Sequence, residues 1–154
     1  MKFYKEPELP PSWMIMEILS FGKISLLFEH LTAREEKNQI CSELGLPNNI
    51  LPSWLHTLTY LRNLTAHHTK ILNRTFTIKP ILPTRRKLRF LTEADFVNNA
   101  KVYCSLCCIE FLLNKIHETT SFKKNLITLI AEYPQIDLER LGFTENWKQE
   151  AIWQ

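Results

Sequence analysis

The sequence predicts an all-α protein, a bundle of four to five main helices. Only three of its 154 residues are glycine, while 45% are hydrophobic and 23% are charged. This composition is ordinary for a globular domain, and the scarcity of glycine favours helices over a β-sandwich or barrel. A chain of this length can bury one core, so we expect residues 1–154 to form a single domain.

The beginning of the chain predicts one long helix. Pro10 and Pro11 keep the start extended, Ser12 is a good N-cap, and the apolar spacing that follows predicts a helix over residues 13–31. Gly22 falls in the middle of this segment, where glycine costs about 1 kcal/mol relative to alanine. We therefore expect Gly22 to allow close packing against a neighbouring helix.

Two further helices are predicted before residue 75. Residues 32–35 form a capping-box pattern that opens a second helix, and a glycine followed by a proline within residues 45–47 ends it. A third helix should begin near Leu51 or Pro52, because proline is tolerated in a first turn. It should end between residues 71 and 74.

A connection rich in proline and arginine, residues 75–90, follows the third helix. Residues 75–78 alternate and include β-branched side chains, so we expect them to be extended. The rest of the chain is predicted to be helical. The expected elements are helices over residues 92–116 and 122–132, short helical turns within residues 136–141 and 144–149, and two tryptophans, Trp147 and Trp153, that fold back onto the core.

The third predicted helix carries the most informative stretch, residues 61–74 (LRNLTAHHTKILNR). A helix turns about 100° per residue, so Asn63 and His67 lie near 100° and 140° when Arg62 is placed at zero. Leu58, Leu61, Leu64 and Leu72 fall on the opposite, apolar side. His68 falls near 240°, at the edge of that apolar side, so the two adjacent histidines should not be equivalent.

The polar side of this helix suggests anion and proton chemistry. The guanidinium of Arg62 can grip phosphate oxygens, and His67 can accept or donate a proton near neutral pH. Asn63 lies one helical turn before His67 and could orient its ring through a hydrogen bond. The alternative is a solvated helix face or a structural hydrogen bond, which is the more common role of an arginine and a histidine at this spacing.

The same stretch resembles the R-x4-6-H motif of the HEPN superfamily, many of whose members are metal-independent ribonucleases. More closely, the chain resembles the Abi-like family of abortive infection bacteriophage resistance proteins. The resemblance covers nearly all of the chain and corresponds to the later part of a typical family chain. Similar blocks occur in order at residues 11–13, 19–22, 53–56, 61–63, 66–68, 73–74, 91–96, 132–134 and 141–147.

The resemblance implies a HEPN-like helical bundle that cleaves RNA without a metal or cofactor. Attack by the 2′-hydroxyl would leave a 2′,3′-cyclic phosphate, with Arg62 stabilising the phosphorane and His67 as the acid–base group. His68 also satisfies the looser spacing and remains a possible support. One His67 per chain supplies only one proton-transfer group, so we expect a homodimer with the site at its interface.

The biological role that the resemblance implies is phage defence by abortive infection, or action as a toxin with an inhibitory partner that the sequence does not identify. A second reading remains open. The chain could be a non-catalytic HEPN-like module that binds RNA, a nucleotide or a protein partner. The nuclease reading requires Arg62 and His67 to be exposed and close together, whereas a binding module tolerates a buried His67.

Positive charge is moderately concentrated after the third helix. The formal net charge of +3 permits nucleic-acid binding without indicating it. Basic side chains near the end of the helix and in the connection could contact an RNA backbone, although a solvated loop is an equally good explanation of the connection. The candidate RNA-binding residues are Lys70, Arg74, Arg85, Arg86, Lys87 and Arg89.

The cysteines and lone histidines are expected to be structural. Cys104 and Cys107 form a CxxC pair, but no second ligand pair follows, so we expect core thiols rather than a metal site. Cys41 is expected to be buried on the second helix. Four cysteines without a signal peptide or a membrane-spanning segment predict a protein of the reducing cytoplasm. The remaining histidines, treated as structural, are His30, His56 and His117.

Overall fold

The computed structural model describes residues 9–83, 91, 98–117 and 119–154. Within these residues the fold is all-α, with six α-helices, three short 3-10 helices and no strand, which confirms the predicted fold class. The elements in chain order are α1 (Ser12–Ile18), α2 (Phe21–Glu29), α3 (Arg34–Glu43), α4 (Ile50–Ala66), α5 (Val102–Ile116), α6 (Phe122–Glu132), η2 (Glu139–Leu141), η3 (Trp147–Gln149) and η4 (Ala151–Trp153).

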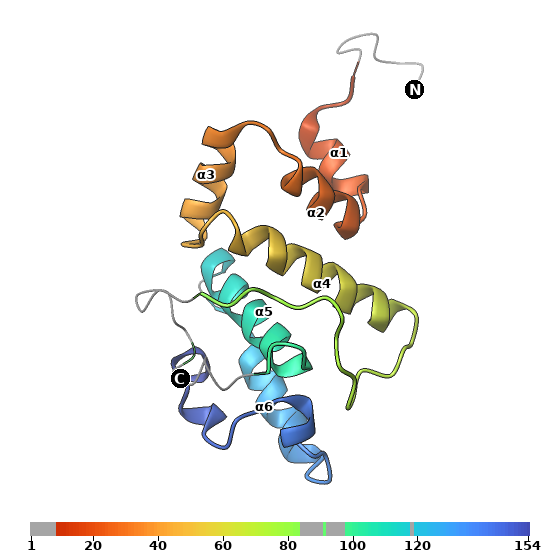
Figure 1. The fold of residues 1–154 in the computed structure, drawn as a ribbon, viewed down its shortest axis with the longest axis vertical. Coiled ribbons are helices and arrows are strands. Elements are labelled where there is room, and N and C mark those ends of the chain that lie inside the picture. Colours follow the sequence, from red (N-terminus) through yellow and green to blue (C-terminus); the bar gives the residue numbers. More distant parts are fainter. Residues whose placement is uncertain (1–8, 84–90, 92–97, 118) are drawn as a thin grey trace.

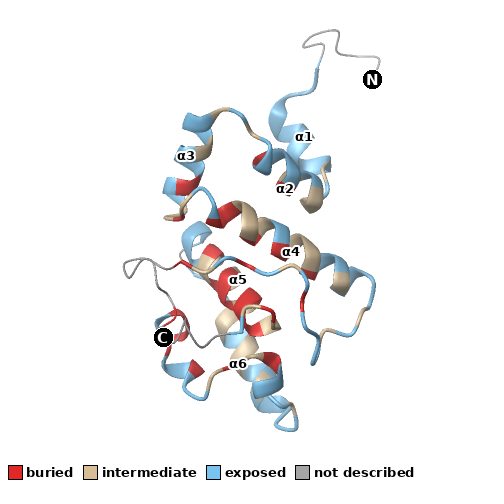
Figure 2. Ribbon diagram, viewed as in Figure 1, coloured by how far each residue is buried: buried red, intermediate tan, exposed pale blue. Residues whose placement is uncertain are grey.

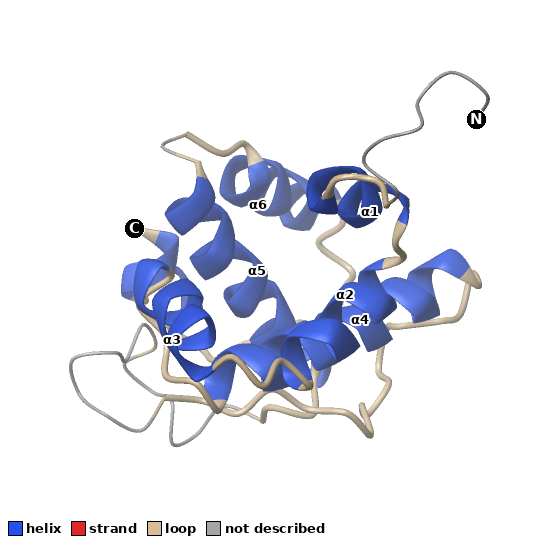
Figure 3. Cartoon of the chain, turned by 90° about the horizontal axis from the view of Figure 1, so that it is seen from above, coloured by secondary structure: helices blue, strands red, loops and turns tan. Residues whose placement is uncertain are grey.

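The longest helix, α4, lies in the middle of the molecule. Helices α1, α2 and α3 lie on one side of it, and α5 and α6 lie on the other, as Figure 1 shows. Figure 3 shows the same helices from above. Helix α4 packs against both α2 and α5. The last 3-10 helix, η4, returns to α5, where Trp153 meets Tyr103 in the first turn. The carboxyl end of α4 lies at one side of the molecule (Figure 1).

The core is concentrated on α4 and α5. Trp54 of α4 is fully buried, and its ring meets Phe111 of α5 edge to face, with the ring centroids 5.4 Å apart. Trp54 Nε1 also donates a hydrogen bond of 2.8 Å to the carbonyl of Ile81, which ties the connection after α4 to the helix. By contrast, α1 has no buried residue, and Figure 2 shows it exposed along its whole length.

The last turns of the chain fold back onto α5, as predicted. Trp147 and Trp153 are buried, and their rings meet edge to face. Trp153 Nε1 donates a hydrogen bond of 3.2 Å to the hydroxyl of Tyr103. Gly142 makes the turn between η2 and η3 at φ +90°, and a Cβ atom there would lie 2.5 Å from Cβ of Lys101. A side chain at this position is therefore excluded both by the backbone and by space.

The amino-terminal helix differs from the prediction. The single helix expected over residues 13–31 is two helices, α1 and α2, separated at Leu19 and Ser20. Ser20 begins the second one, and its hydroxyl accepts a hydrogen bond of 3.4 Å from the backbone N–H of Lys23. Ser12 is the first residue of α1, and Pro11 occupies the N-cap position assigned to it. A serine can end one helix by capping the next, and apolar spacing alone does not reveal this.

Gly22 lies in the first turn of α2 and not in the middle of a long helix. Its predicted role is confirmed, because a Cβ atom added there would lie 3.2 Å from Cγ2 of Thr59 on α4. That distance is shorter than ordinary van der Waals contact. The absence of a side chain at this position therefore lets α2 approach α4 closely.

Helices α3 and α6 are close to expectation. Helix α3 begins at Arg34 with Ala33 as its N-cap, and no side chain caps it, so the predicted capping box was wrong. Its end is as predicted, since Gly45 has φ +67° and the backbone N–H of Leu46 donates to the carbonyl of Cys41 at 2.8 Å. Helix α6 has the predicted bounds.

The two long helices have different bounds from those expected. Helix α4 begins at Ile50 and ends at Ala66, several residues before the predicted end. Helix α5 begins at Val102, whereas residues 98–101 are not helical, and the expected start at residue 92 lies outside the described residues. Residues 75–78 form no strand, although Phe76 is buried and its N–H donates to the carbonyl of Ala100 at 2.7 Å.

Candidate functional site

The end of α4 is shaped by an unusual backbone conformation. The last helical residue is Ala66, and His67 follows as the C-cap. His68 has φ +51°, and its N–H donates to the carbonyl of Thr65 at 3.0 Å, while the N–H of the next residue donates to the carbonyl of Leu64 at 2.8 Å. These two bonds define a Schellman motif with histidine where glycine is usual. They satisfy carbonyls that the helix end would otherwise leave unpaired.

The structure differs from the helical-wheel prediction for His68 and Leu72. His67 keeps a nearly helical backbone, with φ −92° and ψ 16°, so its side chain continues the direction set by the last turn. His68 is exposed and does not lie at the edge of the core, because the left-handed residue turns the chain away from the helix axis. Leu72, placed on the apolar face by the wheel, is 47% exposed beyond the helix.

The three principal site residues lie at the same exposed end of α4. Arg62 and Asn63 are exposed on the helix, and His67 is exposed at its C-cap. Arg62 Nη1 donates a hydrogen bond of 3.1 Å to Oδ1 of Asn63. The side-chain oxygen of Asn63 is therefore bonded to the guanidinium, whereas the sequence suggested that Asn63 orients the ring of His67.

One further side chain beside this surface was missed from the sequence. Tyr60 lies three residues before Asn63 on α4, so the two project from adjacent turns on the same side. A hydrogen bond from Thr77, together with a hydrogen bond and the positive charge of Arg74, lowers the pKa of the Tyr60 hydroxyl, although partial desolvation opposes the shift. Helical phase could have placed Tyr60 beside Asn63, but only the fold brings Arg74 to it.

The return of the chain after α4 explains how Arg74 reaches Tyr60. Asn73 has φ +62°, and the N–H of Arg74 donates to the carbonyl of Ile71 at 3.0 Å, which makes a second tight turn after the one at His68. The ring of Phe76 then packs edge to face against Tyr60, with centroids 5.7 Å apart. Two reversals within a few residues bring the connection back alongside the helix.

The candidate RNA-binding residues are only partly within the described chain. Lys70 and Arg74 are exposed in the segment that leaves α4, and Arg74 approaches the helix again through Tyr60. The four basic residues of the connection, Arg85, Arg86, Lys87 and Arg89, lie outside the described residues. Of the six candidates, the structure therefore describes only Lys70 and Arg74, both exposed in the segment that follows α4.

The cysteines are core residues, as the sequence predicted. Cys41, Cys104, Cys107 and Cys108 are all buried free thiols. Burial raises the pKa of Cys107 and of Cys108, and the neighbouring thiols raise both further. No group of three or more histidine, cysteine or acidic side chains within the described ranges could hold a metal ion. His30, His56 and His117, expected to be structural, are exposed.

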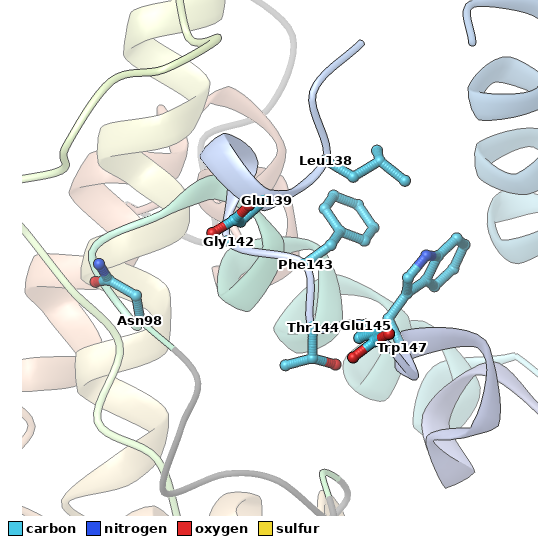
Figure 4. A pocket seen from close by; sticks show the side chains of 8 residues that line it. All are labelled: Asn98, Leu138, Glu139, Gly142, Phe143, Thr144, Glu145 and Trp147. Carbon is cyan, nitrogen blue, oxygen red and sulfur yellow. The ribbon is translucent and has the colours of Figure 1, made fainter. Parts of the chain in front are cut away.

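A separate pocket of about 700 Å³ lies among the turns near the carboxyl end. Figure 4 shows the side chains that line it, which come from Asn98 before α5 and from the segment around η2 and η3. Phe143 and Trp147 form its aromatic wall, and their rings meet edge to face at 5.1 Å. None of the site residues at the end of α4 lines this pocket. It therefore belongs to a different part of the molecule.

Comparison with known proteins gives one match. Residues 1–73 match the model of a family described as Abi-like protein. The Abi-like resemblance seen in the sequence is thereby confirmed over these residues, which include α1 to α4 and both adjacent histidines. The blocks after residue 73 lie outside the match. No curated protein and no solved structure matches the chain.

None of the described helices combines the length and the apolar character needed to cross a bilayer. The longest, α4, contains the exposed Arg62 and Asn63 at its end.

Proposed function

We propose that this protein is a metal-independent endoribonuclease of the HEPN type that acts in abortive-infection phage defence or as a toxin. The observation that carries the proposal is the common exposure of Arg62, Asn63 and His67 at one end of α4, inside the part of the chain that matches the Abi-like family. A fixed cation and an exposed imidazole at the same end of a helix are suited to phosphodiester chemistry.

The proposed reaction begins when the 2′-hydroxyl oxygen attacks the adjacent phosphorus and gives its proton to His67. Charge develops on the phosphorane oxygens, and the guanidinium of Arg62 stabilises it. The P–O5′ bond then breaks, and the leaving 5′-oxygen takes a proton, so the products are a 2′,3′-cyclic phosphate and a 5′-hydroxyl. Asn63 holds the guanidinium of Arg62 through the 3.1 Å hydrogen bond.

The proposal includes a homodimer. One imidazole can serve as base or as acid in a given step, and cleavage requires both. A two-fold axis near the end of α4 would bring His67 of the partner subunit to the opposite side of the same phosphate. The exposed Lys70 and Arg74 would then line the approach to the site from both chains.

The decisive experiment measures RNA cleavage by the purified protein in excess EDTA, with analysis of the product ends. His67→Ala should reduce the rate by about 10²–10⁴-fold, and Arg62→Ala by about 10²–10³-fold. Matched controls come from exposed residues of the same types away from the end of α4. His56→Ala and Arg34→Ala should leave the rate unchanged.

Three results would contradict parts of this proposal. Cleavage that survives in both site variants would place the activity at another site or in a contaminant. Cleavage by a strictly monomeric protein in analytical ultracentrifugation would remove the dimer from the mechanism. RNA binding by folded wild type without cleavage of several RNAs would identify the chain as a non-catalytic binding module.

A further inference from the structure

A buried acidic side chain on α5 has no part in the site at the end of α4. Glu110 is only 2% exposed, although most helix glutamates lie in solvent. Its Oε1 accepts a hydrogen bond of 3.2 Å from Nδ2 of Asn114, one turn later on the same helix. Its Oε2 is buried and has no hydrogen-bond partner among the described residues. A buried carboxyl oxygen without a partner is costly and calls for an explanation.

Glu110 lines a pocket of about 570 Å³ between α5, α6 and the end of the chain. Lys123 and Lys124, in the first turn of α6, line the same pocket and supply two positive charges. Ile127 and Ile152 give it apolar walls. The pocket therefore combines a buried acceptor, apolar walls and cations, which is the usual make-up of a small-molecule site.

These groups define what a ligand must offer. It needs N–H donors for the oxygens of Glu110, because a carboxyl oxygen is a hydrogen-bond acceptor and Oε2 has no partner in the described chain. It also needs an anionic group for Lys123 and Lys124, and a flat or apolar part between them. A volume of about 570 Å³ suits a ligand larger than a single amino acid.

Guanine nucleotides meet these requirements. The Watson–Crick edge of guanine presents two parallel donors, N1–H and the N2 amino group, which match the two oxygens of a carboxylate. Adenine offers one amino donor beside the N1 lone pair, and that lone pair repels a carboxylate oxygen. The phosphate would reach Lys123 and Lys124, and the base would lie against Ile127 or Ile152.

We propose that the pocket around Glu110 is a binding site for a free guanine nucleotide. It is lined by residues of α5, α6 and the last turn and by none of the residues at the end of α4, so it does not depend on the proposed ribonuclease activity. Glu110 reads the guanine edge, and the two lysines hold the phosphate.

Isothermal titration calorimetry of the 154-residue chain with GMP, AMP and guanosine tests the proposal. GMP should bind, and AMP should bind at least about 10-fold more weakly, since a bidentate pair to a base edge discriminates by that factor or more. Guanosine should also bind more weakly than GMP, because it lacks the phosphate. Glu110→Gln should lose the preference for GMP, whereas the exposed Glu132→Gln is the matched control and should keep it.

A second variant keeps the proposal testable if Glu110→Gln does not fold. The double variant Lys123→Ala/Lys124→Ala changes the rim and not the core, so its circular dichroism should equal that of wild type. It should bind GMP and guanosine with similar, weakened affinity. Absence of GMP binding by wild type, equal affinity for AMP and GMP, or unchanged GMP affinity in the lysine double variant would each overturn the proposal.

Discussion

Arg62 donates a hydrogen bond from Nη1 to Oδ1 of Asn63, the next residue in the chain, over 3.1 Å. Adjacent residues on a helix point about 100° apart, so the long arginine side chain must bend around the helix to reach Asn63. The bond restricts the guanidinium without burying it. We therefore expect Asn63 to act on the proposed reaction through Arg62.

A double-mutant cycle tests this role for Asn63. Asn63→Ala should reduce RNA cleavage by about 10-fold, because a misplaced catalytic group loses part of its effect. In the Arg62→Ala background the same change should have no further effect, whereas in the His67→Ala background it should reduce the residual rate again. If Asn63→Ala instead reduces the residual cleavage rate only in the Arg62→Ala background, Asn63 acts on His67.

His68→Gly separates the two adjacent histidines. His68 has φ +51°, a conformation that glycine adopts without strain, so the variant keeps the helix end while removing the imidazole. The free energy of unfolding should stay equal or rise by up to about 1 kcal/mol, measured by urea denaturation. Cleavage should be retained.

The matched change is His68→Val, which puts a β-branched residue into the left-handed region. This variant should lose about 1–3 kcal/mol of stability. If His68→Gly abolishes cleavage while remaining as stable as wild type, His68 is the acid–base group and the assignment to His67 is wrong.

The hydroxyl of Tyr60 should titrate at lower pH than an ordinary tyrosine. The hydrogen bonds from Thr77 and Arg74 and the charge of Arg74 lower its pKa below the usual 10.0. Because the folded state releases this proton before the unfolded state does, stability should rise with pH between the lowered pKa and 10.0, and this gain is lost as the pH falls through the lowered pKa.

Ultraviolet absorbance of tyrosinate at alkaline pH measures this titration, with Tyr60→Phe subtracted to isolate the residue. Arg74→Gln should move the midpoint toward higher pH. Lys79→Gln removes an exposed positive charge that is not among the causes of the Tyr60 shift, and it should leave the midpoint in place. Equal midpoints in wild type and Arg74→Gln would show that Arg74 does not act on Tyr60.

Gly22→Ala tests the contact between α2 and α4. The new Cβ atom would lie 3.2 Å from Cγ2 of Thr59, so the helices must separate slightly. Overpacking of this kind costs about 1–3 kcal/mol, while alanine regains about 1 kcal/mol of helix propensity, so we expect a net loss of stability of up to about 2 kcal/mol.

Thr59→Ser removes the methyl group that Gly22→Ala would meet. The double variant should therefore lose less free energy of unfolding than the two single variants lose in sum. Urea unfolding of the four proteins of the double-mutant cycle measures this difference. Additive effects would mean that the two helices have room for a Cβ atom at this position.

The parts of the fold that local sequence determines were the easiest to predict. Helix α6 begins at Phe122 and ends at Glu132 as expected, because Tyr133 and Pro134 stop a clear apolar period. The buried Trp147 and Trp153 were also predicted from their size alone. The break between α1 and α2 was not predicted. The apolar residues before and after Leu19 and Ser20 keep one helical spacing, and a serine can also lie within a helix.

The exposure of Arg62, Asn63 and His67 was predicted from the sequence, but the backbone shape of the helix end was not. The role of these residues as a site stays a prediction. The left-handed conformation of His68 was not foreseen, because histidine adopts it far less often than glycine does. The approach of Arg74 to Tyr60 depends on two successive reversals of the chain, which no single stretch of sequence specifies.

The hydrogen bond between Trp153 and Tyr103 has a consequence for synthesis of the protein. The two residues are fifty positions apart, and Tyr103 is buried in the first turn of α5. At about 5–20 residues per second, the ribosome makes Trp153 about 3–10 seconds after Tyr103. During that interval α4 and its exposed end are already complete, while the nascent α5 still lacks its aromatic cover. A ribosome-bound chain would therefore carry Arg62 and His67 of the α4 end before its core is closed.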